Sequence, residues 1–153
     1  MNAFINFLND SNKVARFLLG YWLITPIFFG LYILLTAQTT GMQLRELLNI
    51  PTIAIAFLVA CMTVILAAML RLARRENPNT VRIFSIYAVV QQLLVGNLIG
   101  AVGSYFLTRA LWNEPREPFA PVHRWILGAG MTILGMLSGL VLLIALNFFH
   151  LWG

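Results

Sequence analysis

The sequence predicts an all-α membrane protein in which four transmembrane helices form an up-down-up-down bundle. Hydrophobic residues make up 60% of the chain and charged residues only 10%, a composition far from that of a soluble domain. Four apolar stretches each reach the roughly 20 residues that a helix needs to cross a hydrocarbon core about 30 Å thick. No acid, lysine or arginine interrupts these stretches, which run over about residues 17–36, 52–70, 83–108 and 125–149.

The connections between the stretches are short, so we expect residues 1–153 to form one integral membrane domain. Continuous apolar sequence favours helices over barrel strands, in which apolar and polar residues alternate. Before the first span, Phe4 and Leu8 lie four residues apart and share a helix face. This pattern predicts that residues 1–16 form an interfacial segment on the membrane surface, with a loosely ordered tail as the alternative.

Each remaining element has its own local signal. Pro26 predicts a bend in the first span, because a proline ring clashes with the preceding turn of a helix. Leu44, Leu47 and Leu48 share a face and predict a short surface helix before the second span. The loop over residues 71–82 is short, so the second and third spans should form an antiparallel hairpin. Three prolines at every third position predict an extended path over residues 109–124.

Basic residues set the expected orientation, because cytoplasmic loops of membrane proteins carry an excess of lysine and arginine. With the N-terminus inside, the inner segments hold Lys13, Arg16, Arg71, Arg74, Arg75 and Arg82. The outer segments hold Arg45, Arg109, Arg116 and Arg124. The excess favours a multi-pass protein of the cell membrane with both termini in the cytoplasm, and we expect a bacterial inner membrane.

Small residues recur on one face of three spans, where they let helix backbones approach closely. The expected packing positions are Ala56, Ala60 and Ala67 in the second span, Gly96, Gly100 and Gly103 in the third, and Gly128, Gly135 and Gly139 in the fourth. The pattern predicts close helix contacts, either within the chain or with a partner.

The third span also carries three intramembrane amides, Gln91, Gln92 and Asn97. Gln91 and Asn97 lie well away from the predicted glycine face. An amide without a partner in hydrocarbon costs several kcal/mol, so this span needs neighbours on two sides. A central place in the bundle and an oligomeric or larger assembly both meet that need.

Ionisable residues are absent from the predicted spans, which argues against an enzyme or a proton-coupled carrier. His123 and His150 fall on opposite sides of the membrane, so they do not form a joint metal or haem site. We therefore expect no catalytic residue, no cofactor and no metal site. The single cysteine, Cys61, excludes an internal disulfide.

The formal charge of +5 does not indicate nucleic-acid binding, because the basic residues flank membrane spans. Four arginines of one inner loop are candidates for lipid headgroup contacts: Arg71, Arg74, Arg75 and Arg82. Membrane lipids are therefore expected partners.

The loop over residues 109–124 is the best candidate for recognition of a partner protein, because prolines stiffen it and limit the entropy lost on binding. Its candidate contact residues are Trp112, Glu114, Arg116, Glu117, Phe119, His123 and Arg124. A solvated loop without a partner is the alternative.

These observations favour a small non-enzymatic subunit of a larger membrane complex of the secretion, conjugation or respiratory type. The expected partners are other membrane subunits or further copies of the chain. Two alternatives remain open. The first is an oligomeric small channel or uncoupled carrier with Gln91, Gln92 and Asn97 along its path. The second is an immunity-like membrane protein whose specificity lies in the 109–124 loop.

Overall fold

The computed structural model describes residues 7–114 and 121–152, with side chains described for residues 7–114 and 125–147. Its helices are α2 (Ser11–Thr40), α3 (Leu44–Leu48), α4 (Pro51–Ala73), α5 (Pro78–Leu94), α6 (Leu98–Ala110) and α7 (Pro121–Trp152). Three of them contain segments long and apolar enough to cross a membrane: Ser11–Thr40, Pro51–Ala73 and Trp125–Asn147. The chain is therefore an all-helical membrane protein with three candidate spans.

The first span, α2, begins six residues earlier than predicted because Asp10 caps it. The Asp10 carboxylate accepts hydrogen bonds of 3.1 Å from the backbone N–H groups of Asn12 and Lys13. The hydrogen bond from the Lys13 amide, helped by the Lys13 ammonium, lowers the pKa of Asp10. Residues 7–9 form a separate helical turn before the cap, whereas residues 1–6 of the predicted interfacial segment lie outside the described residues.

The helix α2 continues through Pro26 and ends at Gly41, whose φ of 69° lies in the left-handed region that glycine adopts readily. The predicted short surface helix is present as α3. The Glu46 carboxylate accepts a hydrogen bond of 2.9 Å from the Gln43 backbone N–H at its start, and α3 buries Leu47. Pro51 then occupies the first turn of α4, where its missing N–H costs no hydrogen bond.

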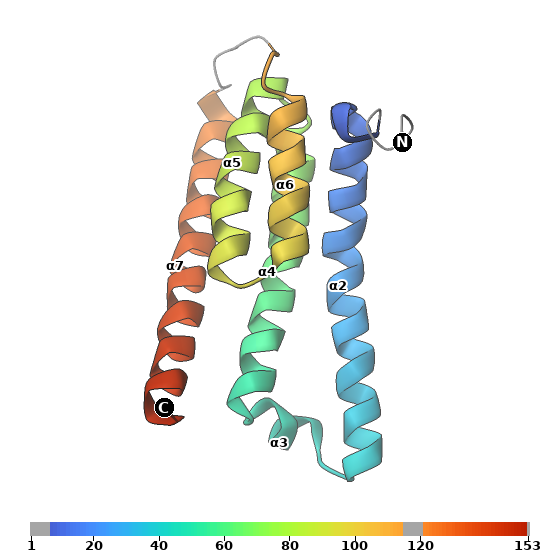
Figure 1. The fold of residues 1–153 in the computed structure, drawn as a ribbon, viewed down its shortest axis with the longest axis vertical. Helices are drawn as coiled ribbons and strands as arrows, with labels where there is room; N and C mark the ends of the chain where they lie inside the picture. Colours follow the sequence, from blue (N-terminus) through green and yellow to red (C-terminus); the bar gives the residue numbers. More distant parts are fainter. Residues whose placement is uncertain (1–6, 115–120, 153) are drawn as a thin grey trace.

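The predicted third span over residues 83–108 is wrong, because the chain reverses direction inside it. Two helices, α5 and α6, replace it and pack side by side as an antiparallel hairpin (Figure 1). At 1.5 Å per residue, α5 is about 25 Å long and α6 about 20 Å. Neither reaches the roughly 30 Å of a hydrocarbon core.

Two adjacent residues, Gly96 and Asn97, make this reversal. Gly96 has a φ of 73°, and its N–H donates to the Leu93 carbonyl over 3.1 Å. The Asn97 N–H donates to the Gln92 carbonyl over 2.8 Å, which completes a Schellman motif at the end of α5. The Asn97 side chain then accepts from the Gly100 N–H over 3.1 Å and caps α6.

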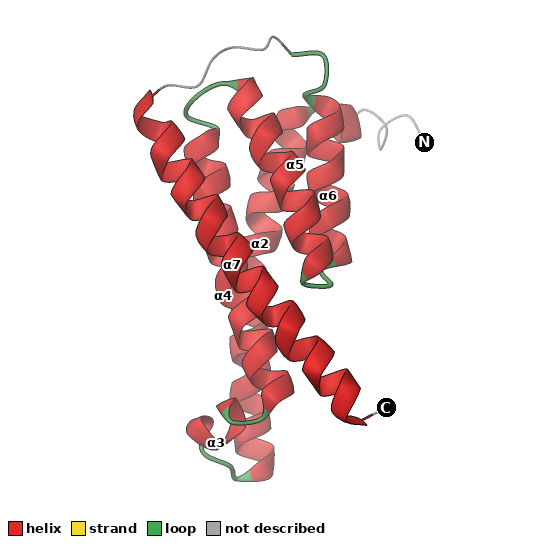
Figure 2. Cartoon of the chain, turned by 90° about the vertical axis from the view of Figure 1, so that its left-hand side faces the viewer, coloured by secondary structure: helices red, strands yellow, loops and turns green. Residues whose placement is uncertain are grey.

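The hairpin returns the chain to the end of the molecule from which it came. We call this end, where α2 and α5 begin and where α4 and α6 end, the basic end. From there α7 runs diagonally across α4 to the opposite end (Figures 1 and 2). Since α2 begins at the basic end and α7 ends at the opposite one, the structure does not confirm the predicted up-down-up-down bundle with both ends of the chain on one side.

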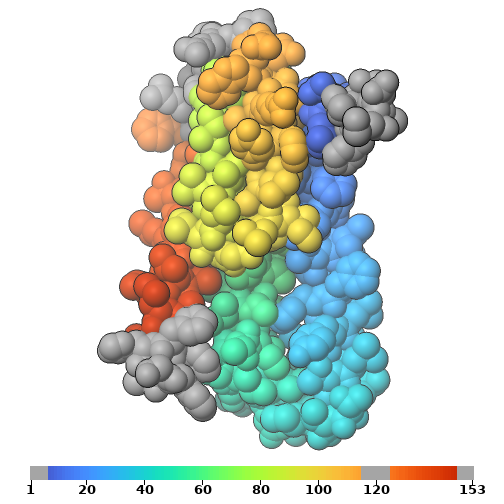
Figure 3. Space-filling model, in the orientation of Figure 1, coloured from blue at the N-terminus to red at the C-terminus, as the bar shows by residue number. Residues whose placement is uncertain are grey.

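The packed core lies in the half of the molecule that contains the hairpin. Four of the five buried residues of α2 lie within its first twelve residues, Val14, Ala15, Leu18 and Trp22. All eight buried residues of α4 lie between Ala60 and Ala73. Figure 3 shows α5 and α6 covering α4 in this half, whereas α4 reaches the surface in the other half, which we call the open half.

Candidate functional site

The tip of the α5–α6 hairpin lies about midway along α2 and α4 (Figure 1). All three predicted intramembrane amides gather there. Gln91 and Gln92 are in the last turn of α5, and Asn97 is the cap of α6. The relative exposures of Gln91 and Gln92 are 1% and 0%, so these amides depend on protein partners.

A continuous chain of hydrogen bonds, which we call the amide chain, connects α2 to α7 through this tip. The Tyr21 hydroxyl donates to Asn97 Oδ1 over 2.6 Å. Asn97 Nδ2 donates to Gln92 Oε1, and Gln92 Nε2 donates to Gln91 Oε1, each over 2.6 Å. Gln91 Nε2 then donates to Ser138 Oγ over 3.1 Å, and Ser138 Oγ donates to the Leu134 carbonyl over 2.7 Å.

The direction of donation is the same along the whole amide chain, from α2 towards α7. Hydrogen bonds arranged head to tail polarise one another, and each gains strength in a medium of low dielectric constant. The sequence analysis left open which neighbours satisfy the amides of residues 83–108. Asn97 reaches α2 on one side and Gln91 reaches α7 on the other, so these amides find partners on two sides within their own chain.

Gly100 makes room for the amide chain. A Cβ atom at this position would collide with the Gln92 side-chain amide and would lie 3.1 Å from Asn97 Nδ2. A second glycine of α6, Gly103, faces a different helix, because a Cβ there would lie 2.7 Å from Leu18 Cδ2 of α2. The two glycines thus bring α6 close to α5 and to α2, respectively.

Two further residues of α5, both distant from the hairpin tip, also make hydrogen bonds that hold the hairpin in place. The Tyr87 hydroxyl of α5 donates to the Met131 carbonyl of α7 over 2.6 Å. At the basic end, Arg82 donates to Asn79 Oδ1 over 2.6 Å and to the Trp112 carbonyl over 3.5 Å. Together with the amide chain, these bonds hold the hairpin at both its base and its tip.

The members of the amide chain are side-chain amides and hydroxyls, which donate and accept hydrogen bonds. Within residues 7–114 and the described part of α7, no group of three His, Cys, Asp or Glu residues is arranged to hold a metal ion. The Trp22 indole N–H is buried beside Phe84 and is the one buried side-chain donor of the described residues without a partner.

The structure separates the four predicted headgroup arginines. Arg71, Arg74 and Arg75 are exposed at the basic end, where Arg74 also donates to Asn12 Oδ1 over 3.3 Å. Arg82 instead turns inward, with 9% of its surface exposed, and bonds to the protein. Its position in the first turns of α5 explains the difference, since there the side chain reaches Asn79 of α5 and the Trp112 carbonyl just after α6.

The candidate partner loop is described only in part. Trp112 is 64% exposed and Glu114 is exposed at the basic end. Arg116, Glu117 and Phe119 lie outside the described residues. His123 and Arg124 belong to the first turn of α7, and their side chains are also outside the described set.

The predicted packing positions fall into three environments. Ala60, Ala67, Gly100 and Gly103 are buried, and Ala56 is half-buried. Gly96 lies in the turn of the hairpin rather than on a helix face. Gly128, Gly135 and Gly139 lie along α7, where Gly128 and Gly139 have no atom within 4 Å of an added Cβ.

Sequence reasoning missed the two outer members of the amide chain, Tyr21 and Ser138, as partners of the amides. It also missed the reversal, although its signal was present: a glycine followed by an asparagine that can cap a helix, inside an apolar stretch of 26 residues. Comparison with protein-family models, curated proteins and solved structures found no match.

Proposed function

We propose that this protein is a non-enzymatic subunit of a larger membrane assembly, and that a partner covers the tip of the α5–α6 hairpin. The observation that carries the proposal is the exposure of that tip. Leu93 and Leu94 at the end of α5 are 53% and 43% exposed, and Gly96 in the turn is exposed as well.

The backbone at the tip supports this reading. Non-helical backbone at membrane depth is tolerated where it is buried in protein or borders water, and not where it faces lipid. The turn at Val95 and Gly96 lies midway along α2 and α4, whose apolar lengths match a bilayer. An exposed turn at this depth therefore favours a partner protein in the open half.

The outer face of α7 supports lateral assembly as well. Its small residues Gly128 and Gly139 have open space around them, and Gly135 contacts only the Tyr87 hydroxyl at 3.7 Å from an added Cβ. Small residues on a free helix face allow a second helix to approach closely in lipid. Another membrane subunit and a second copy of this chain are both suitable partners.

The distribution of basic residues supports a cytoplasmic location for the basic end, in a bacterial inner membrane or a comparable one. Eight of the ten basic residues belong to this end: Lys13, Arg16, Arg71, Arg74, Arg75, Arg82, Arg109 and Arg124. Arg45 belongs to α3 at the opposite end, and Arg116 is outside the described residues. This asymmetry is steeper than the one expected for four spans, and it favours a cytoplasmic start and an external end of the chain.

Photo-crosslinking in the membrane tests the proposal directly. With Leu93 replaced by benzoylphenylalanine, irradiation of cells should attach a second membrane protein, or a second copy, to the hairpin tip. Tyr105, which is 56% exposed on α6 towards the basic end, provides a matched position away from the tip and outside the open half. Adducts with lipid alone at both positions, together with recovery of a lone monomer in mild detergent, would contradict the proposal.

A small channel or uncoupled carrier is the second candidate, and the broken third segment favours it. Transporters place substrate sites near the midplane where helices are interrupted and polar groups are exposed. Asn97 is half-buried at such an interruption. Flux through reconstituted vesicles tests this candidate, and unchanged flux in Asn97→Leu would remove the proposed role of that amide.

A further inference from the structure

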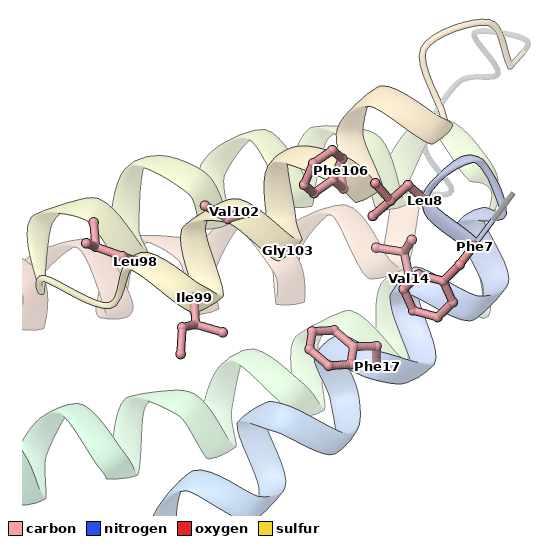
Figure 4. A pocket seen from close by; sticks show the side chains of 9 residues that line it. All are labelled: Phe7, Leu8, Val14, Phe17, Leu98, Ile99, Val102, Gly103 and Phe106. Atoms are coloured by element: carbon pink, nitrogen blue, oxygen red, sulfur yellow. The ribbon is translucent and has the colours of Figure 1, made fainter. Parts of the chain in front are cut away.

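The structure contains an apolar groove between α2 and α6, on the side of the hairpin that faces away from α7. We call it the acyl groove. Its volume is about 430 Å³, and its walls include Phe17 from α2 and Ile99, Val102 and Phe106 from α6 (Figure 4). We propose that this groove holds one acyl chain of an anionic phospholipid whose headgroup lies at the basic end.

The length of the groove fits one leaflet of a bilayer. Its lining extends along α6 from Leu98 to Phe106, a rise of about 12 Å at 1.5 Å per residue. One leaflet contributes roughly 15 Å of hydrocarbon, half of the full core. The groove starts at the hairpin tip, near the midplane, and reaches the interface, where Phe7 closes part of its end.

The bottom of the groove is formed by a close contact between the two helices. Gly103 lines the groove, and the Leu18 side chain fills the space where its Cβ would be. Leu18 has no exposed surface, so α2 and α6 meet behind the groove rather than leaving a gap through the molecule. The Phe7 and Phe17 rings, with centroids 6.3 Å apart, shape its interfacial end.

Charge at that end selects an anionic lipid. Lys13 precedes Phe17 by one turn, and Arg109 follows Phe106 by one turn, so each continues a groove wall towards the water. Both side chains are exposed, and Arg16 adds a third positive charge nearby on α2. The Asp10 carboxylate lies 3.2 Å from the Lys13 ammonium and offsets part of this charge.

Native mass spectrometry of the full chain tests the proposal. The protein is reconstituted in equimolar phosphatidylglycerol and phosphatidylcholine and released in a non-ionic detergent. The expected result is one retained phosphatidylglycerol molecule in excess over phosphatidylcholine. Ile99→Trp fills the groove and should reduce retention roughly tenfold or more, in line with the cost of overpacking a filled site.

Ile133→Trp is the matched control, because Ile133 of α7 is 55% exposed and Ile99 is 60% exposed. It should retain lipid as the unchanged protein does. A variant with Lys13→Gln and Arg109→Gln should keep an acyl chain but lose its headgroup preference by about 25-fold, since each basic residue contributes roughly fivefold near an anionic surface. If Ile99→Trp is not monodisperse, Val102→Phe takes its place.

Three outcomes would overturn the proposal: retained lipid that mirrors the vesicle composition, equal retention by Ile99→Trp and Ile133→Trp, or a preference unchanged by removal of both charges. Failure of the crosslinking experiment at Leu93 would leave the groove unaffected, because Leu93 is not part of its lining.

Discussion

The half of the molecule at the basic end and the open half share the helices α2, α4 and α7 but are packed differently. Trp22, near the hairpin tip, is 1% exposed, whereas Ile27 and Phe28 further along α2 are 61% and 67% exposed. The two additional helices of the hairpin cause the difference, since they end midway along α2 and α4. The open half consists of α3 and the remaining lengths of α2, α4 and α7.

This contrast teaches how a membrane protein is stabilised without a hydrophobic effect between its helices. In lipid, apolar side chains gain little from contact alone, and close backbone approach and interhelical hydrogen bonds supply the specificity. The half at the basic end contains both, at Gly100, at Gly103 and in the amide chain. The open half offers exposed leucine and phenylalanine side chains that lipid or a partner can cover.

The largest expected effect concerns the side of the membrane that Asn113 faces. In a Cys61→Ser background, Asn113→Cys should react with impermeant thiol reagents from the same side as Asn12→Cys, because the hairpin returns the chain to the basic end. The Thr40→Cys reference should react from the other side. Labelling of Asn113→Cys together with Thr40→Cys would show that residues 83–108 cross the membrane completely.

Gly100→Ala should be the most destabilising single change in the half at the basic end. Its Cβ would displace the Gln92 amide, which cannot move without losing two hydrogen bonds. We expect a loss of about 3 kcal/mol, the upper end for overpacking. Gly30→Ala in the open half has free space and should be neutral or slightly stabilising. Unfolding titrations with denaturing detergent measure both variants. Equal losses of unfolding free energy in Gly100→Ala and Gly30→Ala would contradict the difference in packing between the two halves.

Gln92→Leu should have the next largest effect, because Asn97 Nδ2 and Gln91 Oε1 each lose a partner. Leaving buried polar groups unsatisfied costs about 2 kcal/mol. Gln38→Leu, on the exposed end of α2, is the control and should leave the free energy of unfolding unchanged. The same titration measures both, and a neutral Gln92→Leu would indicate that the amide chain does not stabilise the hairpin.

Tyr21→Phe removes only the first hydrogen bond of the amide chain and should have the smallest effect. We expect a loss of about 0.6 kcal/mol, the average for an interhelical hydrogen bond in a membrane. Tyr32→Phe, whose ring is 55% exposed in the open half, should be neutral. If Tyr32→Phe lost as much free energy of unfolding as Tyr21→Phe, the hydrogen bond of Tyr21 would not stabilise the half at the basic end.

Several features of the fold could be predicted from the sequence because they depend on local properties. Apolar length predicts the spans that became α2, α4 and α7, and the shared leucine face predicts α3. Apolar length could not predict the reversal of the chain at Gly96 and Asn97. A glycine is tolerated inside a membrane helix, and Asn97 has its Tyr21 partner 76 residues away in the chain.

The amide residues of the candidate site could be predicted from the sequence, whereas their hydrogen-bond partners on other helices could not. Gln91, Gln92 and Asn97 stand out because amides are costly in hydrocarbon. Their bonds to Tyr21 and Ser138 depend on where α2 and α7 lie relative to the hairpin. Arg82 shows the same limit, because its position beside a span predicts a lipid contact, whereas the fold turns it towards Asn79 and Trp112.

Composition and hydropathy by themselves determined that this chain belongs in a bilayer, is helical and carries its charges outside the apolar segments. Only the tertiary structure decided that the third segment turns back, that the two ends of the chain lie apart and that most basic residues share one end. The physical reason is that transfer into lipid depends on each residue separately. The direction of the chain within lipid depends on hydrogen bonds and close contacts between residues distant in sequence.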